Sequence, residues 1–168
     1  MNVQFYEYCQ NNSGGSFTVD KKVCHRLFIE ASSANEANLI AESLGCYWNG
    51  CSEGRDCDCC GDRWSDNWSD DNYVKVDKYR KEGYEVSVYD HYKNPEEEWM
   101  RKYGKYKMVK PPTKKTEYSF TKYVGLISFA DIEEYAQYLA DEYGWTTPDA
   151  RIFYKNGIVK EIFSSKTK

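Results

Sequence analysis

The sequence lacks the segments that would carry a protein to or into a membrane. Its first residues, 1–7, have neither the basic start nor the apolar core of a signal peptide, and no apolar run approaches the length that spans a bilayer. We therefore expect a cytosolic protein without a membrane partner. In a reducing compartment clustered thiols are more often metal ligands than disulfides, and an odd total of seven cysteines cannot pair completely.

Recognisable catalytic motifs are also scarce. The Gly-Gly pair at 14–15 is followed neither by a helix start nor by the Lys-Ser/Thr of a phosphate-binding loop, which favours a plain turn. Cys24 and His25 are neighbours on an expected strand, where successive side chains point to opposite faces. We therefore expect a buried thiol beside an exposed imidazole and no reacting pair. His91 follows an aspartate but is otherwise isolated as an acid-base candidate.

Aliphatic residues are few, whereas 16 Tyr, 7 Phe and 5 Trp bring the aromatic fraction to 17%. Rings with a polar end suit both a thin core and a contact surface.

The length fits a single domain over 1–168. The net charge of −4 is too small to attract nucleic acid or membrane over the whole surface, but it is unevenly distributed. Residues 46–71 form an acidic, cysteine-rich loop, and residues 105–122 form a basic connecting loop.

The most secure structural prediction is a strand over 23–31 followed by a capped helix. In a capping box, Ser33 and Glu36 can each satisfy a free amide of the first turn. Apolar residues then recur at helical spacing along one face, and Gly45 stands where a left-handed C-terminal stop belongs.

The remaining pattern predicts an α+β fold. We expect a hairpin of strands 3–9 and 16–19, strands at 73–76 and 84–90 with a turn at 81–83, a helix over 94–104, a strand over 123–127, a second main helix from Ser128 to Gly144, and a hairpin over 150–163 around Asn156-Gly157. These elements suggest two layers, a mainly antiparallel sheet with two main helices on one face.

Five of the seven cysteines lie within residues 46–60, where glycines allow the chain to double back. Zn²⁺ prefers four ligands in a tetrahedron, and two adjacent cysteines rarely bind one metal. The selected ligands are Cys46, Cys51, Cys57 and Cys60, with Cys59 as the spare and Cys9, Cys24, His25 or His91 as replacements for Cys46. A site closed by four protein ligands is structural. Unligated thiols, or disulfide or redox use, are the alternatives.

Three tryptophans, Trp48, Trp64 and Trp68, flank this polar loop. They either cover the sheet as a small satellite core or line a binding face.

A later segment interleaves cations with aromatic rings, which suits a nucleotide or single-stranded nucleic acid because cations hold phosphates and rings stack on bases. The candidate ligand-binding residues are Trp99, Arg101, Lys102, Tyr103, Lys105, Tyr106, Lys107, Lys114, Lys115 and Tyr118. The alternative is a solvated lysine-rich loop lying over the protein's own acidic loop.

Two stretches resemble a family of short uncharacterised accessory proteins of tailed bacteriophages: residues 11–17, and Gly50-Cys51 with the run from Asp56 to Trp64. The likeness covers about the first 65 residues. It implies a virus-encoded protein of the host bacterial cytoplasm that binds a host component or sequesters a host signal.

From these features we expect a non-catalytic binding protein that holds an anionic ligand, a nucleotide-type signal or nucleic acid. The first alternative is a protein-protein inhibitor of a host (defence) protein, acting through the tryptophan-flanked acidic loop. A small hydrolase built around His91 is the weaker alternative. The oligomeric state is left open.

Overall fold

The computed structural model describes residues 2–77, 79–90 and 116–166, which fold as two compact units. The first unit, residues 1–77 and 129–168, contains a four-stranded sheet in the order β1-β2-β5-β6. Its strands are β1 (Gln4–Cys9), β2 (Arg26–Ala31), β5 (Ala150–Phe153) and β6 (Val159–Ile162). β2 pairs antiparallel with β1 and parallel with β5, and β5 pairs antiparallel with β6. The predicted mainly antiparallel sheet is confirmed.

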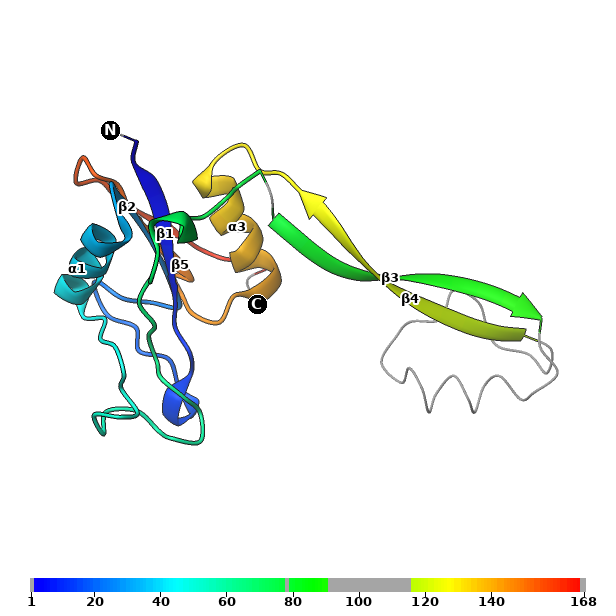
Figure 1. Ribbon diagram of the computed structural model, residues 1–168, viewed down its shortest axis with the longest axis horizontal. Coiled ribbons are helices and arrows are strands. Elements are labelled where there is room, and N and C mark those ends of the chain that lie inside the picture. The colour runs from blue at the N-terminus through cyan, green and yellow to red at the C-terminus, as the bar shows by residue number, and fades with distance from the viewer. Residues whose placement is uncertain (1, 78, 91–115, 167–168) are drawn as a thin grey trace. The chain divides into compact units, whose positions relative to one another are not determined.

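The two helices of this unit, α1 (Ala34–Leu44) and α3 (Ile132–Tyr143), lie on opposite faces of the sheet (Figure 1). Leu27 and Ile29 pack in one cluster with alanines of α1. Phe28 points the other way, and its ring centroid lies 5.9 Å from that of Tyr135 on α3. The α+β class is therefore confirmed, but the expectation that both helices cover one face is wrong. Because β2 is apolar on both sides, each side needs a cover.

The capping box of α1 forms in part as predicted: Ser33 caps an amide of the first turn, whereas the Glu36 carboxylate binds an amide that precedes the N-cap. Ser33 Oγ accepts a hydrogen bond from the Glu36 amide at 3.1 Å, and the Glu36 carboxylate accepts one from the Ser32 amide at 2.8 Å. Gly45 ends the helix with φ at 119°, a left-handed conformation that glycine adopts without a steric penalty. This end directs the chain into the cysteine-rich loop.

The partner of β1 differs from the prediction. β1 pairs with β2, so that Glu7 lies opposite Phe28 and Cys9 lies opposite Arg26. Residues 16–19, the predicted partner, belong instead to a loop over 10–25 that contains the 3₁₀ turn Ser13–Gly15. The buried apolar side chains of β2 make it the better partner, since pairing with it extends a continuous core.

The second unit, residues 78–128, is an antiparallel pair of β3 (Tyr79–Asp90) and β4 (Thr116–Ile127). The predicted turn at 81–83 is wrong, because Gly83 is paired with Tyr123 inside the ladder. Residues 73–76 form no strand, whereas the predicted strand 123–127 is confirmed as part of β4. The basic connecting loop predicted over 105–122 is wrong over 116–122, because these residues lie in β4. Residues 105–115 and the predicted helix over 94–104 lie outside the described residues.

The C-terminal elements follow the sequence closely. β5 and β6 form the predicted hairpin around Asn156-Gly157, and Gly157 has φ at 92°. α3 begins later than predicted, after Asp131, whose carboxylate accepts from the Glu134 amide at 2.9 Å. Gly144 does not end α3 in a left-handed turn, since its φ is −72°. A glycine is needed there for lack of space, because a Cβ at position 144 would lie 2.3 Å from the Ala140 carbonyl oxygen.

A buried carboxylate, Asp149, joins the first residues of β2 to the segment that connects α3 with β5. It is fully buried and accepts from His25 Nδ1 and from an Arg26 guanidinium nitrogen, both at 2.7 Å. The backbone amide of Trp145 donates to it at 2.8 Å. Burial alone would raise the pKa of Asp149, but these hydrogen bonds and the nearby cation outweigh burial and lower it.

We predict that Asp149→Asn lowers the free energy of unfolding by about 3 kcal/mol, because it removes the nearer counter-charge of the buried Arg26 and leaves only the Glu7 carboxylate, 3.7 Å away. The lowered pKa makes this contribution fully present above about pH 3.9, the ordinary value for aspartate, and lost as pH falls through the folded-state pKa. Urea unfolding at pH 7 and at pH 3 measures both effects. The exposed Asp66 is the control, and Asp66→Asn should change stability by less than about 0.5 kcal/mol. Equal losses for the two variants at pH 7 would contradict the prediction.

Candidate functional site

Three thiols of the cysteine-rich loop converge. The Sγ atoms of Cys57, Cys59 and Cys60 all lie within 4.8 Å of one another, close enough to share one metal ion. The Cys59 thiol and the amides of Cys59 and Cys60 hydrogen-bond to Cys57 and lower the pKa of its thiol. Contacts with the Cys57 and Cys60 thiols raise the pKa of the Cys59 thiol to about 12, so Cys57 ionises before Cys59. Three sulfur donors at this spacing fit a thiophilic divalent ion.

The structure groups the predicted ligands differently from the sequence. It brings together Cys57 and Cys60, adds Cys59, which the sequence left as the spare, and does not bring Cys46 or Cys51 into this group. Cys46 is buried in the core cluster under α1, and this burial raises the pKa of its thiol to about 12. Cys51 directs its sulfur at the Cys57 carbonyl oxygen, 3.4 Å away. A tight turn brings the adjacent pair of thiols beside Cys57.

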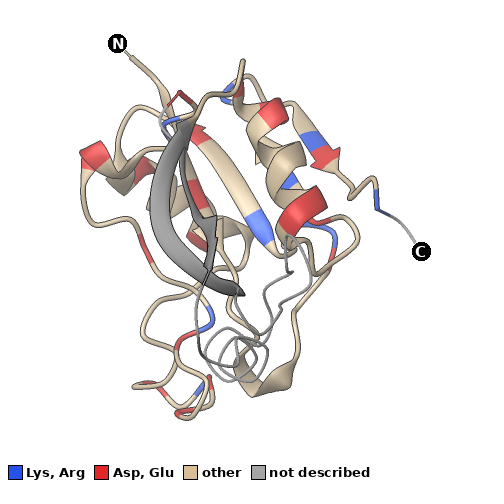
Figure 2. Ribbon diagram, turned by 90° about the vertical axis from the view of Figure 1, so that its right-hand side faces the viewer, with Lys and Arg blue, Asp and Glu red and all other residues tan. Residues whose placement is uncertain are grey.

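Carboxylates of the acidic loop fold it from within. Asp56 accepts from the Tyr47 hydroxyl at 2.6 Å and from the Arg63 amide at 2.7 Å, and Asp62 accepts from the Cys51 amide at 2.9 Å. Gly50 leaves room for the Asp56 carboxylate, because a Cβ there would lie 1.9 Å from one of its oxygens. Acidic and basic residues accordingly lie close together in this loop, at the foot of the view in Figure 2.

The same loop holds the segment 10–18 in place. Asn11 Nδ2 donates to the Cys60 carbonyl oxygen at 2.6 Å, and the Cys57 amide donates to Ser13 Oγ at 3.0 Å. Arg63 donates to Gln10 Oε1 and to the carbonyl oxygens of Ser13 and Ser16, at 2.7–2.8 Å. Any ion bound by the three thiols would therefore steady this segment.

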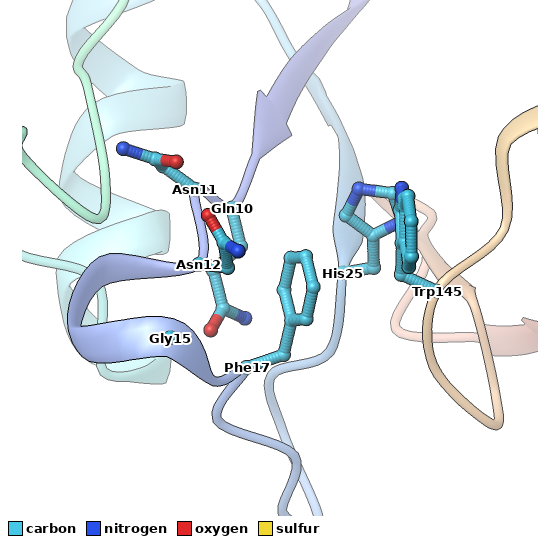
Figure 3. Close-up of a pocket in the computed structure, with 7 residues that line it drawn as sticks. All are labelled: Gln10, Asn11, Asn12, Gly15, Phe17, His25 and Trp145. Carbon is cyan, nitrogen blue, oxygen red and sulfur yellow. The ribbon is translucent and has the colours of Figure 1, made fainter. Parts of the chain in front are cut away.

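The segment 10–18 forms one wall of a pocket of about 470 Å³ (Figure 3). The lining residues are Gln10, Asn11, Asn12, Gly15, Phe17, His25 and Trp145. The Phe17 ring is stacked on Trp145, with centroids 6.2 Å apart and planes at 19°, and meets the His25 ring edge to face at 5.0 Å. Trp145 is 71% exposed, so its ring stands at the rim.

His25 connects this pocket to a cysteine that sequence reasoning did not pair with it. Its Nδ1 contacts Asp149, and its Nε2 lies 3.7 Å from Cys9 Sγ. The prediction that Cys24 and His25 form no pair agrees with the structure, in which the Cys24 thiol donates to the Arg26 carbonyl oxygen. The prediction of an exposed His25 is wrong, since it is buried. The signal that could have revealed this contact is the β1-β2 pairing, which places Cys9 opposite Arg26.

The three tryptophans around the loop have different surroundings. Trp64 is buried in the core cluster, and Trp48 packs against that cluster with its ring stacked on Tyr8. Trp68 is 84% exposed. Two of the three therefore serve the core.

Most of the predicted cation-aromatic segment lies outside the described residues. This holds for Trp99, Arg101, Lys102, Tyr103, Lys105, Tyr106, Lys107, Lys114 and Lys115, and for His91. Tyr118 is the exception, in β4 opposite Val88 of β3. The binding role of this segment stays a prediction.

No helix in the described ranges has the length and apolar character needed to cross a bilayer. One family model matches the chain over residues 3–123, and its description is a domain of unknown function, DUF7296. That range includes Cys9, His25 and the three clustered thiols, whereas Trp145 and Asp149 lie beyond it. No curated protein and no solved structure matches the chain.

We predict that Cys59→Ser abolishes stoichiometric zinc binding by the reduced protein, because it removes one of three converging thiols. Cys51→Ser is the matched control from the same loop and should retain the metal. Mass spectrometry of metal content after dialysis against zinc measures the stoichiometry. The opposite pattern, with zinc lost in Cys51→Ser and kept in Cys59→Ser, would contradict the grouping.

Proposed function

The chain belongs to the DUF7296 family of unknown function, and we propose that it is a binding protein for a small molecule with a planar ring, of the nucleotide type. The observation that carries this proposal is the pocket between the segment 10–18 and Trp145, in which two aromatic rings stand beside amide and imidazole groups. A pocket of about 470 Å³ is of the size that holds such a ligand.

Ring stacking provides the main attraction. The planes of Phe17 and Trp145 are nearly parallel, and the exposure of Trp145 leaves ring surface free for a ligand. Every nucleobase has a π-face, and base-aromatic stacking contributes roughly 1–3 kcal/mol per base. A planar heteroaromatic ring therefore suits this pocket better than a flexible aliphatic molecule does.

Polar groups on the wall provide selectivity. The Asn12 amide points toward the pocket (Figure 3), and an amide both donates and accepts hydrogen bonds, as the edge of a base does. Gln10 has a different role, because its amide donates to the Thr18 and Cys24 carbonyl oxygens and accepts from Arg63. Gln10 therefore stabilises the wall of the pocket, and recognition of the ligand depends on the neighbouring residues.

A metal ion at the three clustered thiols would stiffen the same wall. We assign it as Zn²⁺ with a supporting role for the wall, because Zn²⁺ accepts thiolates and is redox-inactive; Cys57, Cys59 and Cys60 would supply three of the four ligands that it prefers. Asn11 and Ser13 are bonded to the backbone of this cluster. Ordering the wall before binding lowers the entropic cost of holding the ligand.

The wider setting follows from the sequence. The sequence further predicts that the cations between Arg101 and Lys115 bind phosphates, either of a nucleotide-type ligand or of nucleic acid. The resemblance of residues 11–17 and 50–64 to phage accessory proteins suggests sequestration of such a ligand in the host bacterial cytoplasm.

A second candidate is inhibition of a host protein through the acidic loop. The observation that favours it is Trp68, 84% exposed beside the acids Asp66, Asp70 and Asp71. Exposed tryptophans are frequent anchors of protein interfaces.

For the first proposal, we predict that nucleosides and nucleotides bind at low salt and that Trp145→Ala weakens binding about tenfold or more, through loss of stacking. Isothermal titration calorimetry with purine and pyrimidine nucleosides and their monophosphates measures it, and equal affinities for both forms would locate recognition in the ring. Trp68→Ala is the control and should bind normally. Absence of binding by every such ligand would refute the proposal, and loss of a host partner in Trp68→Ala would support the second candidate.

A further inference from the structure

We infer that Cys9 is a nucleophilic thiol served by His25 as its general base, so that this pair can accept and cleave a small activated acyl compound, an ester or thioester. The inference goes beyond the proposed function, because it adds covalent chemistry at a defined atom, and it shares with the pocket only His25, one of the lining residues.

The orientation of the imidazole is the first support. Asp149 is fully buried and accepts a hydrogen bond from His25 Nδ1 at 2.7 Å. A carboxylate there keeps the ring proton on Nδ1, so the lone pair of Nε2 is directed away from it. Cys9 Sγ lies 3.7 Å from that Nε2, within hydrogen-bond reach for sulfur. Carboxylate, imidazole and thiol thus stand in the order that base-assisted nucleophiles require.

The surroundings make the base necessary. Neighbouring protein atoms partly desolvate the Cys9 thiol and so raise its pKa; the Arg26 guanidinium opposes this shift, and the carboxylates of Glu7 and Asp149 add to it. The thiol is therefore protonated at neutral pH, and it needs an acceptor for its proton at the moment of attack. His25 is that acceptor.

The thiol is also accessible and distinct from the other cysteines. Cys9 is exposed, as are Cys59 and Cys60, whereas Cys24 and Cys46 are buried. In the described part of the chain, Cys9 is the one thiol found in contact with an imidazole nitrogen. His25 itself lines the pocket, as does Asn12, whose side-chain amide can donate to a carbonyl oxygen.

The reaction balances without a further reagent. The Cys9 proton moves to His25 Nε2 as Sγ bonds to the acyl carbon, and the leaving group then departs with that proton as its bond to carbon breaks. Water next attacks the thioester, His25 takes a proton from this water, and the released Cys9 sulfur recovers it. The net change is hydrolysis of the acyl compound to an acid and the protonated leaving group.

The experiment treats the full chain with 4-nitrophenyl acetate and follows both 4-nitrophenolate release and acetylation of individual cysteines by peptide mass spectrometry. Cys9 should be the fastest site to acetylate, and Cys9→Ser should lose the rapid phase. His25→Gln should slow acetylation at Cys9 about 100-fold, the usual scale of general-base catalysis.

Two further variants separate chemistry from folding. Free imidazole should restore acetylation at Cys9 in His25→Ala. Free imidazole should not restore acetylation in Asp149→Asn, because the His25 ring is still present there and only its tautomer is no longer set. Asp149 therefore acts as a positioning residue. Circular dichroism and urea unfolding report the integrity of each variant.

Acetylation at Cys9 that is no faster than at the other cysteines, or that is unchanged in His25→Gln, would overturn the inference. So would a failure of imidazole to restore a folded His25→Ala variant. These outcomes are independent of ring-ligand binding by the unmodified protein, so the binding proposal and the chemical inference can fail separately.

Discussion

The buried carboxylate of Asp149 is the constraint on which the first unit of this protein depends. It is fully removed from solvent and is satisfied by His25, Arg26 and the Trp145 amide, from two distant parts of the chain. Because an unpaired buried charge is costly, these partners must stay together in the folded state. The same contacts orient the His25 imidazole and place Trp145 at the rim of the pocket, so one interaction serves stability and site geometry alike.

A second constraint acts from the opposite wall of the pocket. The cysteine-rich loop is folded by Asp56 and Asp62, which accept from groups within the loop, and it holds the segment 10–18 through Asn11, Ser13 and Arg63. The cysteine-rich loop therefore supports the wall of the pocket from behind. The lining itself consists of Asn11, its neighbours and residues from other segments, and not of residues from this loop. A metal ion at the three thiols would act on ligand binding through this support.

Local signals predicted the elements whose structure depends on adjacent residues. The Ser33 cap of α1 and the hairpin at Asn156-Gly157 form as expected, because their stabilising hydrogen bonds and backbone angles lie within a few residues. The turn expected at 81–83 failed for the complementary reason. A glycine in a polar stretch favours a turn locally, but pairing along the whole of β3 and β4 outweighs that preference.

The sequence by itself determined the α+β class, the presence of the two main helices and the concentration of thiols between positions 46 and 60. Only the tertiary structure decided that the helices cover opposite faces, that Cys59 joins Cys57 and Cys60, and that Cys9 meets His25. The physical reason is the separation along the chain between the residues that come into contact. A cap or a tight turn is a contact between near neighbours, whereas these contacts arise from strand pairing and loop closure between residues whose separation along the chain carries no signal of their meeting.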